Sequence, residues 1–216
     1  MTPEDWAAAR AARARGDYAT ECRIYRLLAE QGDAQAQDSL GVMYENGWGL
    51  AKSYVEAVTW FRRAAEQGNA NAQNNLGVMY ETGLGVPVNH AEAARWYRLA
   101  AEQGNANAQH NLANRYESGQ GTTQDYAEAV YWYRMAANQR HPMAQANLGV
   151  MYEYGHGVPQ DLVEAHKWFN LSVAGFPASE AKNRGIAIRN RDQLAARMTP
   201  EQIAEAQQRA RAWKPA

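Results

Sequence analysis

A serine and a lysine stand three residues apart near the end of the chain, at Ser179 and Lys182. On a helix this spacing places a hydroxyl nucleophile and an amine on one face, as in penicillin-recognising enzymes. Those enzymes also carry Ser-Asp-Asn and Lys-Thr-Gly sequences, and this chain has neither. We therefore expect a solvated helix start with Ser179 as its N-cap and no penicillin-recognising activity.

The histidines and the single cysteine are the remaining candidates for catalysis or metal binding. The five histidines are His90, His110, His141, His156 and His166, and the only thiol is Cys22. No two histidines stand four residues apart beside a carboxylate, as a zinc hydrolase requires, and one cysteine forms neither a disulfide nor a thiolate cluster. We expect no catalytic residues, no metal site and no cofactor.

One run of polar residues suits recognition better than catalysis. Arg115 could bind a carboxylate in bidentate geometry, while Asn114 and His110 could hydrogen-bond to a peptide backbone. A second interpretation stays open, in which these residues result from drift at a half-exposed site.

The element that positions these residues is a repeat. Trp60, Trp96, Trp132 and Trp168 are spaced by 36 residues, and units in this frame run without insertion over 29–172. Each unit contains two stretches with apolar residues on one helical face, which predicts a helical hairpin. Glycine pairs such as Gly83 and Gly85 stand between the two stretches and mark a turn, since no strand precedes them and the phosphate-binding spacing is absent. Hairpins of this kind must stack to bury both faces.

The repeated residues are those of a known family. The pattern A-x-x-x-L-G-x-M-Y-E-x-G-x-G-V over 72–86, followed by E-A-x-x-W-Y-R-x-A-A-E-Q-G over 92–104, resembles the Sel1-like repeat, a relative of the tetratricopeptide repeat. The resemblance implies an all-α fold, a right-handed superhelical solenoid of helix-turn-helix units of the bacterial type. It also implies a scaffold or adaptor function, with the first helix of each unit lining a concave surface.

Binding residues are expected where the units differ from one another. The first helices repeat their core residues but vary along one stripe, which we therefore call the variable stripe. This stripe is expected to face away from the predicted core. It consists of Gln35, Asp38, Val42 and Asn46; Asn71, Asn74, Val78 and Thr82; Asn107, His110, Asn114 and Ser118; and Met143, Ala146, Val150 and Tyr154.

A neighbouring row holds Ser39, Asn75, Asn111 and Asn147, each just before the repeated leucine. By resemblance to tetratricopeptide repeats, an asparagine here grips the C-terminal carboxylate of a peptide. The alternative is structural, since a buried amide that ties adjacent hairpins also needs hydrogen-bond partners. The predicted peptide-binding residues are Asn74, Asn75, His110, Asn111, Asn114, Arg115, Asn147 and Tyr154.

The segments outside the repeats are predicted to be caps: helices over 1–28 that include a partial repeat, and helices over 173–216. Residues 29–172 hold 9 Lys and Arg against 15 Asp and Glu, whereas residues 173–216 hold 8 against 4, so the tail should be attracted to the repeats. Thr199-Pro200-Glu201-Gln202 has the sequence of a capping box that starts a last helix. The dispersed arginines of the tail are not expected to bind nucleic acid.

Composition agrees with a scaffold. The net charge of the 216 residues is -1, and no apolar run is long enough for membrane insertion. We predict a monomeric, non-enzymatic interaction protein that binds a peptide or protein in the concave groove. It would be cytoplasmic as written, or periplasmic or secreted if a leader was removed. The alternative function is an enzyme or small-molecule receptor built on the polar residues near Arg115.

Overall fold

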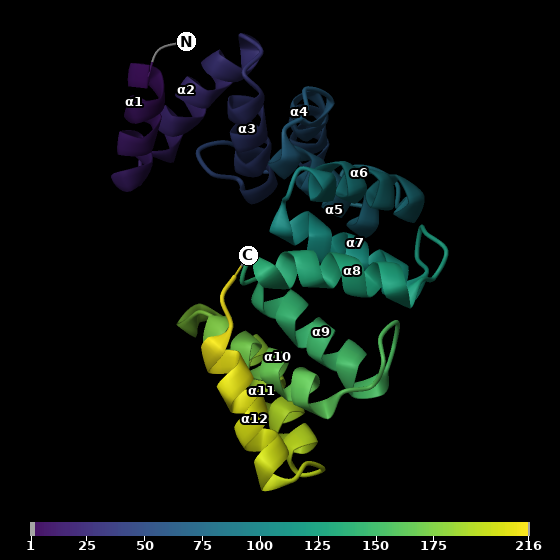
Figure 1. The fold of residues 1–216 in the computed structure, drawn as a ribbon. Helices are drawn as coiled ribbons and strands as arrows, with labels where there is room; N and C mark the ends of the chain where they lie inside the picture. The colour runs from purple at the N-terminus through teal and green to yellow at the C-terminus, as the bar shows by residue number, and fades with distance from the viewer. Residues whose placement is uncertain (1–2, 216) are drawn as a thin grey trace. The chain divides into compact units, whose positions relative to one another are not determined.

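The structure is a computed structural model that describes residues 3–215. These residues form a series of helical hairpins (Figure 1). The chain divides into two compact units, Met1–Gln103 and Gly104–Ala216, which are called here unit one and unit two. Unit one contains α1 (Pro3–Ala14), α2 (Tyr18–Glu30), α3 (Ala34–Asn46), α4 (Tyr54–Glu66), α5 (Ala70–Thr82) and α6 (His90–Glu102). No helix within residues 3–215 is long and apolar enough to cross a membrane.

Unit two repeats the hairpin and then departs from it. It contains α7 (Ala106–Ser118), α8 (Tyr126–Asn138), α9 (Pro142–Tyr154), α10 (Leu162–Gly175), a 3-10 turn (Ala178–Glu180), α11 (Ala181–Ala195) and α12 (Pro200–Ala212). The hairpins predicted from the 36-residue frame are confirmed, with α3, α5, α7 and α9 as first helices.

Polar caps and glycines set the helix ends. Asn69 accepts a hydrogen bond from the Ala72 amide at the start of α5, and Gly83 ends that helix at φ 75°. Gly85 is required for a second reason, because a Cβ there would lie 2.4 Å from the Tyr54 carbonyl oxygen. The predicted turn at the two glycines is therefore confirmed, and the loops at Gly49, Gly85 and Gly157 each lie against the start of the preceding second helix.

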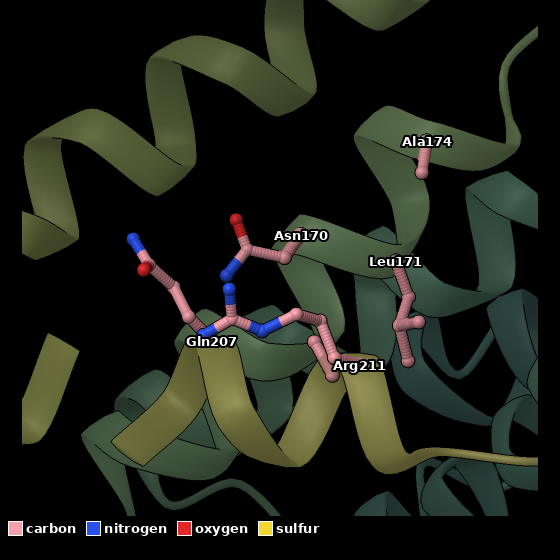
Figure 2. A pocket seen from close by; sticks show the side chains of 6 residues that line it. Asn170, Leu171, Ala174, Gln207 and Arg211 are labelled. Atoms are coloured by element: carbon pink, nitrogen blue, oxygen red, sulfur yellow. The ribbon is translucent and has the colours of Figure 1, made fainter. Parts of the chain in front are cut away.

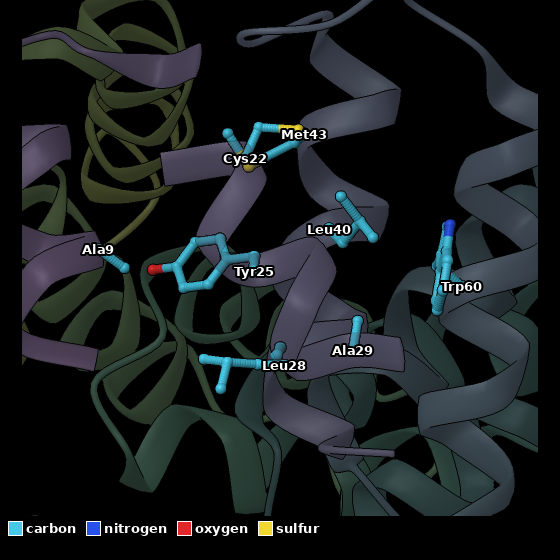
Figure 3. Close-up of a cluster of buried hydrophobic side chains, with 9 residues drawn as sticks. Ala9, Cys22, Tyr25, Leu28, Ala29, Leu40, Met43 and Trp60 are labelled. Carbon is cyan, nitrogen blue, oxygen red and sulfur yellow. The ribbon is translucent and has the colours of Figure 1, made fainter. Parts of the chain in front are cut away.

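Large side chains of the second helices close the core between hairpins. Figure 3 shows Leu40 of α3 between Trp60 of α4 on the right and Tyr25 and Leu28 of α2 on the left, with Met43 of α3 beside Cys22. The repeated tryptophans are all buried, as the spacing predicted; their exposed fractions are 9% for Trp60, 8% for Trp96, 8% for Trp132 and 5% for Trp168. Cys22 is buried with a free thiol in the same cluster as Tyr25, in agreement with a small core residue.

The tail helices pack on the last repeat. Trp213, just after α12, meets Trp168 of α10 edge-on at 5.9 Å, and Arg209 Nη1 lies 2.7 Å from Glu164 Oε1. Thr199 and Gln202 form the predicted capping box. The prediction for Ser179 is wrong, because Ser179 lies in the 3-10 turn and α11 starts after Glu180 without a side-chain cap.

Candidate functional site

The variable stripe lies half in the core and half in solvent. Its end positions, such as Asn71, Thr82, Asn107 and Ser118, are exposed, whereas the middle positions are half-buried or buried. Asn74 is buried, so it does not face away from the core as expected. A ligand on this face would therefore touch the end positions directly.

In unit one the asparagine row ties two repeats together. Asn75 Nδ2 of α5 donates to Asp38 Oδ1 of α3 at 3.0 Å. The pKa of Asp38 is raised to about 6, mainly by burial and also by the nearby Glu45 carboxylate, against the opposing effect of the Asn75 hydrogen bond. The carboxylate is thus poorly solvated and depends on the asparagine of the next repeat.

Unit two uses the same tie with an imidazole in place of the carboxylate. Asn147 Nδ2 of α9 lies 3.4 Å from His110 Nε2 of α7, and His110 Nδ1 lies 3.3 Å from Asn111 Oδ1. A neutral imidazole with its proton on Nδ1 satisfies both contacts. Burial lowers the pKa of His110 to about 4, helped by the neighbouring His141.

Asn114 belongs to the same network. Its Oδ1 accepts from Asn147 Nδ2 at 3.2 Å and lies 2.5 Å from the Tyr133 hydroxyl, which also contacts the Glu117 carboxylate. Burial and Glu117 raise the pKa of Tyr133, so the phenol stays protonated. The structure thus brings together four predicted site residues, namely His110, Asn111, Asn114 and Asn147.

The sequence pattern did not identify His141 as part of this cluster. The His141 ring stacks on His110 with centroids 4.8 Å apart. Its Nδ1 accepts from the Ala144 amide as the N-cap of α9, and its Nε2 lies 3.2 Å from Asn107 Oδ1. The 36-residue frame carried the signal, since His141 stands where Asn69 and Asn105 cap their helices.

Two further predicted residues lie apart from the cluster. Arg115 is 8% exposed, so the expectation of a half-exposed position is wrong; its Nη1 donates to Gln120 Oε1 at 3.0 Å in the loop after α7. The counterparts of Arg115 in the other repeats are Met43, Met79 and Met151, which are all buried. Arg115 therefore occupies a core position. Tyr154, at the end of α9, is 59% exposed and tilts against His156.

A helix of the chain already lies on the stripe of α9. A cleft of about 80 Å³ between α9 and α11 is lined by Met143, Ala146, Asn147, Val150, Phe176, Asn183, Ile186, Ala187 and Asn190. Ala187 of α11 is buried in a cluster with Met143, and Leu194 of α11 in one with Val150. Within residues 3–215, no three or more His, Cys, Asp or Glu side chains are arranged to hold a metal ion.

Known proteins share both the repeat and the fold. A family model described as Sel1 repeat matches residues 34–69, 70–105, 106–141 and 142–174. A Sel1 repeat protein from Oxalobacter formigenes is 32% identical with a TM-score of 0.71, over 82% of this chain and 49% of that one. The protein c5321, a protective antigen of uropathogenic Escherichia coli with an SLR fold, is 30% identical with a TM-score of 0.57, over 90% of this chain and 48% of that one.

This chain therefore spans about half the length of those two proteins. The immunity protein Pa5087 from Pseudomonas aeruginosa, at 19% identity and a TM-score of 0.55 over 91% of this chain and 84% of that one, shares the fold. No curated protein matches. Four matched repeats in register with the hairpins show that this chain belongs to the Sel1 repeat family.

Proposed function

We propose that this chain is a protein-interaction scaffold that binds a segment of a partner protein along the variable stripe of its first helices. The observation that carries the proposal is the seat of α11 on α9, where Met143, Ala146 and Val150 line a cleft with Asn183, Ile186 and Ala187. The stripe of one repeat thus accepts a helix through small and apolar side chains.

The asparagine row contributes to this face indirectly. Asn75 and Asn147 are both hydrogen-bonded to the preceding first helix, which supports the structural alternative over direct capture of a carboxylate. A ligand would instead meet the exposed ends of the stripe, such as Asn107, Ser118 and Tyr154. Their mixed polar and aromatic character suits a peptide surface, and their variation between repeats provides selectivity.

Site-specific photo-crosslinking tests this proposal. A photoreactive amino acid is placed at Asn107 or Tyr154 on the first-helix face, and at Tyr131 or Met135, two exposed positions on the second helix α8. We expect one partner protein to be crosslinked from the first-helix positions and not from α8. Crosslinking from α8 alone would place the binding surface on the second helices and contradict the proposal.

A further inference from the structure

A series of glutamine pairs, called here the glutamine ladder, closes the hairpins α3–α4, α5–α6 and α7–α8. In each step, a glutamine after a second helix donates its Nε2 to the Oε1 of a glutamine on the preceding first helix. The pairs are Gln67 with Gln37 at 2.7 Å, Gln103 with Gln73 at 2.7 Å and Gln139 with Gln109 at 2.8 Å. The frame places the two members 30 residues apart.

The ladder ends on an acceptor that lacks its donor. Gln145 of α9 keeps the usual bond from its Nε2 to the Ala137 carbonyl, at 3.2 Å. The position that should supply the donor is Gly175, and Gln145 Oε1 has no hydrogen-bond partner in the described part of the chain. Gln145 is only 2% exposed, and a buried acceptor without a donor is unfavourable.

A cavity occupies the place of the missing side chain. It measures about 240 Å³ and is lined by Arg140, Gln145, Leu171, Ala174, Gly175 and Trp213. A second cavity of about 320 Å³ shares Leu171 and Ala174 with it. Figure 2 shows this second cavity, with Arg211 projecting from α12 towards Asn170 of α10 and Gln207 of the same helix lining it farther along.

From this geometry we infer that the two cavities form a binding site for a glutamine side chain of another polypeptide. The NH₂ of the ligand amide donates to Gln145 Oε1, as Gln139 does for Gln109. Its methylenes contact Leu171 and Trp213, and its carbonyl oxygen accepts from the Arg140 guanidinium. The adjoining cavity receives the peptide backbone that carries the glutamine.

The charges of the site select against other side chains. A carboxylate satisfies Arg140 but cannot donate to Gln145 Oε1, and an aliphatic chain leaves that acceptor unpaired. A lysine ammonium donates well, but Arg140 and Arg211 line the two cavities and repel a cation. The primary amide alone matches the acceptor, the apolar walls and the guanidinium together.

Peptide titration of the full chain followed by NMR tests this inference. The probe is the blocked peptide acetyl-AAAQG-amide, and its comparison peptides carry glutamate or norleucine in place of glutamine. We expect the Gln145 side-chain amide signals to shift saturably with the glutamine peptide, at about fivefold lower concentration than with either comparison peptide. Equal binding of the glutamate peptide would overturn the inference, because Arg140 alone would then explain it.

Two variants with matched controls complete the test. Gly175→Gln supplies the donor from the chain itself, so it should abolish peptide binding and raise the melting temperature, whereas Gly175→Ala should not raise it. Gln145→Met removes the acceptor, so any remaining binding should no longer prefer glutamine over norleucine. Undiminished glutamine-selective binding by Gly175→Gln or by Gln145→Met would contradict the site.

Discussion

The first helices of unit one and unit two make the same contact between repeats with groups of opposite chemistry. In unit one, an asparagine amide donates to Asp38, whereas in unit two it donates to a neutral His110. Both acceptors are poorly solvated, so burial raises the pKa of the acid and lowers the pKa of the imidazole. Asp38 and His110 thus occupy the same frame position and accept the same bond with opposite charge chemistry, so the two ties should respond to pH in opposite directions.

The largest effect is expected at the repeated tryptophan, which fills the same core position in each unit. Trp96→Ala in unit one and Trp132→Ala in unit two should each lower the free energy of unfolding by about 3–5 kcal/mol, because each leaves a cavity between hairpins. Urea denaturation followed by circular dichroism measures both losses. Trp6→Ala in α1 should cost less, since Trp6 is only partly buried; an equal loss there would mean that the core is misplaced.

The next largest effect is expected at a close contact between α5 and α6. A Cβ at Gly77 would lie 2.6 Å from the Tyr97 ring; in the same frame position, unit two has Ala113 on α7 and Gly149 on α9. Gly77→Ala should therefore destabilise the protein by about 1–3 kcal/mol through overpacking. The reverse change, Ala113→Gly, should cost about 1–2 kcal/mol, from helix propensity together with the loss of a buried methyl group. Thermal melts compare the two, and a stabilising Gly77→Ala would show that the ring moves freely.

Acidification should weaken the tie of unit two. The folded pKa of His110, about 4, lies below the ordinary histidine value of about 6.5, so this contribution to stability is complete above pH 6.5 and is lost as pH falls towards 4. Between pH 7 and pH 5, the wild type should lose about 1–2 kcal/mol more than His110→Asn, which copies Asn74 of unit one. Urea melts at the two pH values measure this, and identical losses would mean that His110 is well solvated when folded.

Acidification should strengthen the tie of unit one. Asp38 has a folded pKa of about 6 against an ordinary aspartate value of about 3.8, so the folded state binds the proton more tightly and gains stability as pH falls from 6 to 3.8. Asp38→Asn keeps an acceptor for Asn75 without the charge. It should raise stability by about 1 kcal/mol at pH 7.5, and the gain should fall by about half at pH 5 and disappear near pH 3.8. A gain that does not shrink between pH 7.5 and pH 4 would contradict the buried charge as its cause.

The smallest expected effect concerns the turn after a second helix. Unit one has Gly32 and Gly68 there at positive φ, whereas unit two has Arg140 at φ 65°, the one non-glycine residue with positive φ among residues 3–215. Arg140→Gly should raise the free energy of unfolding by about 1 kcal/mol, because a side chain is strained in this conformation. Thermal melts of Arg140→Gly and Gly68→Ala test this: the melting temperature should rise in the first variant and fall in the second.

Hairpins, caps and core were predictable because the 36-residue frame repeats their causes. The buried tryptophans, the glycine turns and the capping box at Thr199 all follow from residue type and spacing. The burial of Arg115 did not follow, because a long side chain can replace Met79 in the core and still bring its guanidinium to Gln120. The local sequence does not show where such a chain ends.

Contacts between repeats were the hidden part of the site. The frame aligned Asn75 with Asn147, but it did not show that each bonds to the first helix before it. The glutamine ladder was equally hidden, because its partners stand 30 residues apart and meet only when the two helices of a hairpin pack together. Positions that vary between repeats thus include both surface residues and residues that hydrogen-bond one repeat to the next. Only the folded structure distinguishes the two kinds.

The central claim, that a partner protein binds along the variable stripe, is tested most directly by its affinity for two triple variants. One changes Asn107, Ser118 and Tyr154 to alanine on the first helices; the other changes Ala127, Tyr131 and Met135 of α8 to serine, with all six residues exposed. For the partner recovered by crosslinking, we expect the first variant to raise the dissociation constant at least about tenfold and the second to leave it unchanged. Unchanged affinity in the first variant, with loss in the second, would contradict the account.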